Sequence, residues 1–141
     1  MRYSFFSLLF FIVCNVYAES PLSPIKLDNP RNTMKIFMDS MNIYKEGLDT
    51  NNQDKKNKIQ TAVKCLNLND ISPLLRQEQG KEIAIFLKET IDRVIVFSPD
   101  YIEIPEDITS SYWVIPETEI SISAIDIDGR RLFLFTSNTV L

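Results

Sequence analysis

The chain has 141 residues, enough for one ordinary domain. It has no histidine, which excludes Ser-His-Asp and Cys-His triads, His-ligated zinc and histidine acid–base chemistry. The 15 Lys and Arg are outnumbered by 19 Asp and Glu, and no readable basic stripe favours binding to nucleic-acid phosphates. A hydrophobic content of 45%, with 7 Pro and only 3 Gly, is typical of a globular protein and not of a disordered or fibrous one.

The first segment, 1–18, has the three parts of an export signal. Arg2 provides a positive start, an almost unbroken apolar run covers 5–13, and the segment ends in the small residue Ala18. About 20 apolar residues are needed to span a bilayer, so this run is short for a permanent anchor. We expect cleavage after Ala18 and a periplasmic or secreted product, the alternative being an uncleaved anchor in the inner membrane.

The expected mature chain, 19–141, loses Arg2 and Cys14. Its formal charge becomes −5, and Cys65 is its one remaining cysteine. A single cysteine cannot form an intramolecular disulfide, so stability must come from the hydrophobic core. No other stretch reaches the roughly 18 consecutive apolar residues of a spanning helix, so we expect no membrane span in the mature chain. Because the chain is acidic, we also expect no nucleic-acid partner.

The mature chain is expected to begin with an extended lead-in over 19–28, which contains two prolines and no hydrophobic periodicity, followed by a single domain over 29–141. Asn29 before Pro30 predicts a helix start, because the Asn side chain accepts an unpaired amide and proline has no amide to satisfy. Apolar residues at helical spacing then predict a helix over about 30–45, with Gly47 as its stop. The predicted buried face contains Met34, Phe37, Met38, Met41 and either Tyr44 or Leu48.

Two more helices are expected after a polar connection over 49–57. A weaker one covers about 54–66, with Ile59, Ala62, Val63 and Leu66 on one face. The strongest helical pattern covers about 73–93 and begins at Ser72 and Pro73, a second cap-plus-proline start. Its predicted buried stripe contains Gly80, Ile83, Ala84, Leu87, Ile91 and Val94.

The hydrophobic period changes after Arg93. The runs 94–97 and 101–104 are β-rich, but Pro99 and Pro105 punctuate them, so we expect edge-like or irregular strands there. A clearer strand is predicted at 112–115.

The last part of the chain reads as a hairpin. Residues 119–127 alternate, but the apolar side chains change face between Ile122 and Ile125, which indicates a bulge. The turn signal Asp128-Gly129 leads to a partner strand over 130–135, and 136–141 resembles the first turn of another helix. Three helices followed by an antiparallel meander predict an α+β domain with the helices on one face of a small sheet.

Candidate metal ligands are confined to acidic residues in the last third of the chain. The cluster Asp100, Glu103, Glu106 and Asp107 could gather a hard cation through oxygen ligands. It lacks the alternating spacing and central glycine of a calcium loop, so we interpret it as a solvated loop. Asp126 and Asp128, on either side of Ile127, are interpreted as turn residues.

Two sulfur-containing features could have a functional role or a core role. Cys65 could act as a nucleophile, but the usual base is absent and its apolar neighbours favour a small core residue. Met34, Met38 and Met41 could form a soft Cu(I) site, yet their spacing is equally that of a buried helix face, which we favour. No cofactor is therefore expected.

The single tryptophan, Trp113, lies beside Tyr112 and could present a binding surface or anchor the core. A lone Trp inside a strand is more often in the core. The glycines Gly47, Gly80 and Gly129 stand too far apart to build a phosphate-binding loop. We assign no catalytic, cofactor-binding or metal-binding residue.

Several segments form a more specific pattern when they are taken in chain order. They begin with Asn-Pro-Arg-Asn-Thr-Met at 29–34 and continue at 37–42, 62–68, 76–84, 87–93, 115–120 and 134–140. In this order they resemble the exported N-terminal domain of some bacterial MscS-type mechanosensitive channels. The resemblance covers about 29–140 and consists of packing and capping patterns, so it carries over no catalytic residue.

The resemblance implies a periplasmic domain that precedes the pore of a channel gated by membrane tension. Those proteins continue into several transmembrane helices where this sequence ends, and a chain without spanning helices cannot conduct ions. The resemblance therefore leaves two expectations open, a stand-alone relative of the domain or the leading fragment of an interrupted channel gene.

Our leading hypothesis is a non-catalytic, exported accessory or interaction module, with a protein partner at the inner membrane. The alternative is a periplasmic small-ligand-binding domain of the cone-shaped, cystatin-like type, in which helices and a curved sheet enclose an apolar pocket. A metal-dependent hydrolase that uses the carboxylates of 100–107 ranks below both.

Overall fold

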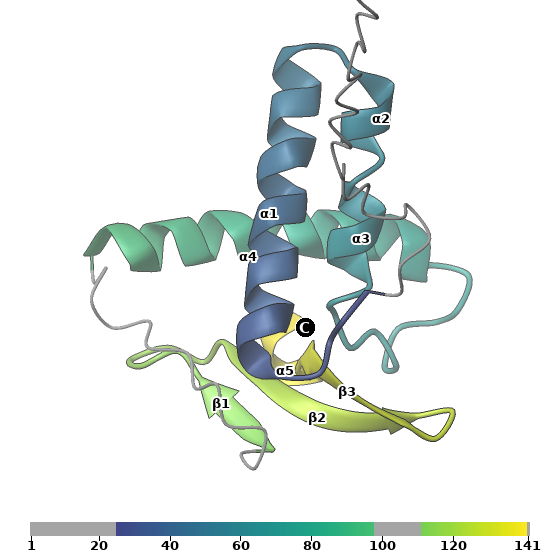
Figure 1. Cartoon of the computed structure of the whole chain (residues 1–141), viewed down its shortest axis with the longest axis vertical. Helices are drawn as coiled ribbons and strands as arrows, with labels where there is room; N and C mark the ends of the chain where they lie inside the picture. The colour runs from purple at the N-terminus through teal and green to yellow at the C-terminus, as the bar shows by residue number, and fades with distance from the viewer. Residues whose placement is uncertain (1–24, 98–110, 141) are drawn as a thin grey trace, which may run out of the picture.

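A computed structural model describes residues 25–97 and 111–140. Its elements are α1 (Pro30–Asp49), α2 (Gln53–Lys56), α3 (Ile59–Val63), α4 (Arg76–Phe97), β1 (Tyr112–Val114), β2 (Ser121–Ile127), β3 (Arg130–Phe135) and α5 (Ser137–Val140). The strands form one antiparallel sheet in the order β1-β2-β3. The N-terminal end of helix α1 lies on this sheet, and helix α4 crosses α1 (Figure 1). The predicted α+β class is confirmed.

Helix α1 begins as predicted. The Oδ1 atom of Asn29 accepts a hydrogen bond from the Asn32 amide at 2.7 Å, and Pro30 occupies the first helical turn. The predicted end near residue 45 is wrong, because the helix continues through Gly47 to Asp49.

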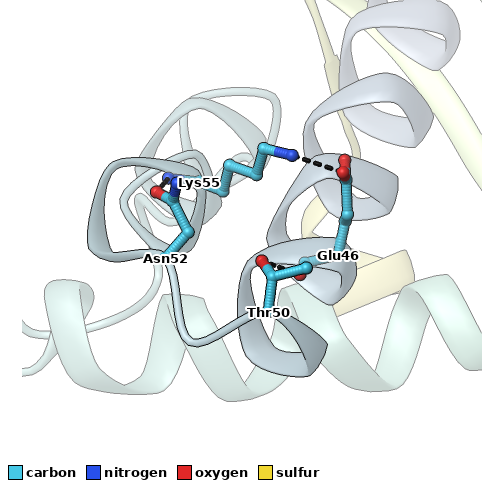
Figure 2. Close-up of polar contacts among 4 residues, drawn as sticks. All are labelled: Glu46, Thr50, Asn52 and Lys55. Atoms are coloured by element: carbon cyan, nitrogen blue, oxygen red, sulfur yellow. Dashed lines mark hydrogen bonds and ion pairs between the residues drawn. The ribbon is translucent and has the colours of Figure 1, made fainter.

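Gly47 lies inside α1 because α2 packs directly against it. A Cβ atom at position 47 would lie 2.6 Å from the backbone nitrogen of Lys56. The turn between the two helices is held by polar contacts (Figure 2): Asn52 Oδ1 accepts from the Lys55 amide at 3.1 Å, and the Lys55 ammonium pairs with Glu46. The signal that predicted a helix stop therefore marks a close helix–helix contact.

The predicted second helix is divided into α2 and α3. Between them the backbone tightens: the Lys58 amide donates to Lys55 O at 3.1 Å and the Thr61 amide to Lys58 O at 2.9 Å, both spanning three residues. The predicted apolar face is nevertheless buried at Ile59 and Ala62.

Helix α4 differs from its prediction at both ends. Residues 73–75 form a turn, and the helix begins at Arg76, whose amide donates to Ser72 O at 3.1 Å. At the other end 94–97 is helical, so the expected β-rich run is wrong there. The physical reason is packing, because Val94 and Ile95 continue the buried stripe and pack against the core, which outweighs their β propensity. The other expected run, 101–104, lies outside the described residues.

The sheet follows the predicted hairpin without the predicted bulge. Strands β2 and β3 pair without interruption from Ile122 opposite Phe135 to Ile127 opposite Arg130. The apolar side chains change face because Ile125 and Ile127, on the face opposite Ile122, are also half-buried, and Ile125 pairs with Leu132 of β3. The turn is confirmed, with Asp128 and Gly129 at φ values of 50° and 73°.

One hydrophobic core joins α1 to the sheet. The rings of Phe37 and Phe135 meet edge to face with centroids 5.0 Å apart, and Phe133 is also fully buried. The buried Thr33 hydroxyl donates to the Phe133 carbonyl at 2.6 Å. The space between α1 and the sheet is therefore filled by side chains.

The outer edge of β3 is covered by backbone from two earlier segments. The Phe133 amide donates to Leu27 O at 2.8 Å, and the Phe135 amide donates to Cys65 O at 2.9 Å. The Asn67 amide returns a bond to Phe135 O at 2.9 Å. Leu27, in the expected lead-in, is thus part of the buried core, and this end of β3 offers no free edge for strand addition.

Candidate functional site

Cys65 is a core residue, as predicted. It is fully buried, and its Sγ atom lies 3.6 Å from Thr61 O. Burial raises the pKa of the thiol from 9.0 to about 12, because desolvation disfavours the thiolate. Only the thiolate is a good nucleophile, so Cys65 is chemically inert in the folded chain near neutral pH.

This burial predicts both thiol reactivity and alkaline stability. We expect Cys65 to resist a thiol reagent at pH 8 in the native chain and to react after unfolding in urea. Between pH 9 and 12 the unfolded thiol releases its proton but the folded thiol does not. The contribution of Cys65 to the free energy of unfolding is therefore fully present below pH 9 and decreases as the pH rises toward 12. The decrease is at most about 1.4 kcal/mol per pH unit.

The measurement compares urea unfolding of the wild type and Cys65→Ala between pH 8 and 10.5. The variant keeps the titrating lysines and tyrosines, so the difference in slope reports Cys65 alone. Equal slopes, or rapid labelling of the native thiol, would contradict the prediction.

The methionines and the tryptophan belong to the core rather than to a site. Met34 and Met41 are buried, and Met38 and Trp113 are half-buried against the core. Tyr112, beside Trp113, is 55% exposed.

Of the acidic residues considered as ligands, the structure describes only Asp126 and Asp128. The cluster at 100–107 lies outside the described residues; Asp128 is a turn residue, as predicted, but Asp126 lies inside β2, opposite Arg131. Among residues 25–97 and 111–140, no group of three or more His, Cys, Asp or Glu side chains could hold a metal ion. Within the same ranges, no helix combines the length and apolar character needed to cross a bilayer.

A surface that the sequence prediction missed lies on the outer side of α4. Phe86 is 72% exposed there, and Ile85 beside it is also exposed. Next to Phe86 a hollow of about 330 Å³ is lined by Ile83 and Leu87 of α4 and by Ile120 and Val140 from the sheet side.

On the other side of this surface, Ile85 faces α1. A hollow of about 230 Å³ lies there between Ile85 and the α1 residues Tyr44 and Leu48. We call Ile85 and Phe86, with the two hollows beside them, the α4 outer face. In the sequence, this face is indicated by the apolar pair Ile85 and Phe86 among the charged residues of the helix.

A third hollow, also missed by the sequence prediction, lies beside β3. It has a volume of about 800 Å³ and is bordered by the α3–α4 connection, the β2–β3 hairpin and 25–27. We call it the β3 groove. Its cationic residues come from four separate parts of the chain: Lys58, Lys64, Arg76 and Arg130.

Comparison with known proteins found no match. The protein-family models, curated proteins and solved structures that were compared gave no match to this chain.

Proposed function

We propose that this chain is a non-catalytic exported domain that acts as an accessory or interaction module at the inner membrane, as its resemblance to the periplasmic region of MscS-type channels implies. The observation that carries the proposal is the α4 outer face, where Phe86 is 72% exposed beside one hollow and Ile85 borders the other. An exposed aromatic side chain beside apolar hollows is typical of a protein-binding surface.

The energetics favour a partner that covers Phe86. Burying an apolar side chain of this size is worth about 1.5–3 kcal/mol, and aromatic anchors often dominate the energy of an interface. The hollow beside Phe86 is walled by Ile83, Leu87 and Ile120, so a partner side chain can insert next to the ring. We therefore expect one apolar segment of a partner protein to lie along α4.

A photo-crosslinking amino acid at position 86 is expected to capture that partner when the full chain is produced with its own N-terminus in a bacterial host. The matched control is position 42, because Asn42 is also exposed on a helix. The captured protein is then purified, and its affinity is measured for the wild type, Phe86→Ser and Asn42→Ser. We expect about 30-fold weaker binding for Phe86→Ser alone, the effect of losing about 2 kcal/mol. Equal crosslinking at both positions, or equal affinity of all three chains, would overturn the proposal.

Export is proposed with cleavage after Ala18. N-terminal sequencing of the periplasmic product is expected to begin at Glu19. Lys or Asp in place of Ala18 is expected to prevent this cleavage, because signal peptidase needs a small residue there. A product that retains Met1 in the wild type would overturn the cleavage site.

A small-ligand-binding domain remains the second candidate function. It is favoured by a different observation, the β3 groove, whose volume of about 800 Å³ is within the usual range for ligand sites.

A further inference from the structure

The β3 groove concentrates positive charge in an acidic chain. Lys58, Lys64, Arg76 and Arg130 line it, and the lining residues include no Asp or Glu within the part of the chain that the structure describes. The formal charge of the whole chain is −4, so this distribution opposes the overall composition. Gathering like charges around one hollow raises its positive potential and attracts an anion.

The four cations are available to an external anion. Lys58, Lys64 and Arg130 are exposed, and across 25–97 and 111–140 none of the four takes part in an ion pair. Arg76 is held in place by two backbone carbonyls, donating through Nε to Ile71 O at 2.9 Å and through Nη2 to Asn69 O at 3.2 Å. These carbonyls fix the guanidinium without neutralising its charge.

The remainder of the groove is largely apolar. Leu27, Leu66 and Leu134 are buried at its wall, and Ile25, Ile127 and Leu132 are half-buried. A small hydrophilic anion such as phosphate would leave this wall unused. A ligand with an anionic head and an apolar tail would use both parts, pairing its head with the cations and burying its tail against the leucines.

We propose that the β3 groove binds a single-chain anionic amphiphile, such as a long-chain fatty acid. This inference rests on the second candidate function and is independent of the α4 outer face, which lies on other residues. The concave shape of the groove favours one extracted molecule over the flat surface of an anionic membrane, although both present the same head and chain chemistry.

The test uses the full chain as exported by its host and a dansyl-labelled undecanoic acid as the probe. We expect dansyl fluorescence to increase and shift to shorter wavelength when the probe enters the groove, and unlabelled laurate to displace it. Dodecanol has the same chain length without the charge, so it is expected to compete at least tenfold less well. Raising the salt concentration is expected to weaken probe binding, because the cations are exposed.

The variant that tests the cations is Lys64→Glu/Arg130→Glu, with Lys45→Glu/Lys35→Glu as the control for the same change in net charge. Lys45 and Lys35 are exposed on α1 and do not line the groove. We expect at least tenfold weaker probe binding for the groove variant and unchanged binding for the control, with circular dichroism verifying the fold of both. Leu132→Ser tests the wall separately, with an expected loss of probe affinity at all salt concentrations.

Three results would overturn the inference. They are the absence of saturable probe binding by the folded chain, equal binding by the groove and control variants, and equal competition by laurate and dodecanol. A further arm adds vesicles of anionic phospholipid: binding to vesicles without binding to monomeric laurate would assign the groove to a membrane surface and reject the single-chain ligand. The crosslinking experiment at Phe86 tests a different surface, so a failure to capture a partner there would not change any of these expected results.

Discussion

Replacement of Phe37 by alanine is expected to lower the free energy of unfolding by about 3–5 kcal/mol, the usual cost of removing a buried phenylalanine ring. Phe37 is fully buried, and its ring meets that of Phe135 at a centroid distance of 5.0 Å, where α1 stands on the sheet. Because small domains have about 5–15 kcal/mol of stability in total, this loss is a large fraction of the free energy of unfolding, and the urea midpoint is expected to fall accordingly.

Urea unfolding followed by circular dichroism measures this change. The matched control is Phe86→Ala, which removes the same side chain from an exposed position and is expected to change stability by about 0.5 kcal/mol or less. Similar effects for the two variants would show that the contact between α1 and the sheet does not hold the domain together.

Gly47→Ala is expected to destabilise the protein by about 1–3 kcal/mol, the usual cost of overpacking. In an ordinary helix interior the same change is favourable by about 0.5–1 kcal/mol. The sign reverses here because the added Cβ would lie 2.6 Å from the Lys56 nitrogen and 2.9 Å from the Lys55 carbonyl carbon. These are backbone atoms, so α2 as a whole must move away from α1.

Thermal unfolding of Gly47→Ala and Asn42→Ala tests this prediction. Asn42 is an exposed residue of the same helix, and its replacement is expected to have no effect or to stabilise slightly. A Gly47→Ala chain as stable as the wild type would mean that the α1–α2 turn can open without cost.

The sequence predicts those features that depend on neighbouring residues. Asn29 and Pro30 define the start of α1 through a local hydrogen bond, and Asp128-Gly129 defines the hairpin through its positive φ values. The spacing of Phe37 and Met41 identifies the buried face of α1 for the same reason. The α+β class follows from the order of these local signals.

Features that depend on distant partners were predicted wrongly or missed. Gly47 predicts a helix end by local rules, but it lies inside α1, where α2 packs too close to leave room for a Cβ atom. The residues 94–97 have local β propensity, yet packing of Val94 and Ile95 keeps them helical. The change of face between Ile122 and Ile125 predicts a bulge, but β2 pairs with β3 without interruption, and Ile125 and Ile127 are half-buried.

The β3 groove shows the same limitation for the candidate site. Its cations, at 58, 64, 76 and 130, are too widely spaced to appear as a basic stripe in the sequence. They come together only because the α3–α4 connection lies beside β3, where Leu66 bridges to Phe135. Phe86, in contrast, stands among charged residues of one helix and has a local signal.

The covering of the β3 edge also constrains the order in which the domain can be completed. The Thr33 hydroxyl and the Leu27 carbonyl both bind Phe133, and the first of these contacts joins residues 100 positions apart. Contacts of such separation form late and slow folding, because a long stretch of chain must be ordered first. The helices can therefore form early, but the N-terminal residues find their partners only after the β2–β3 hairpin has emerged. A chain with this topology remains open while it is synthesised, and it closes when its last strand arrives.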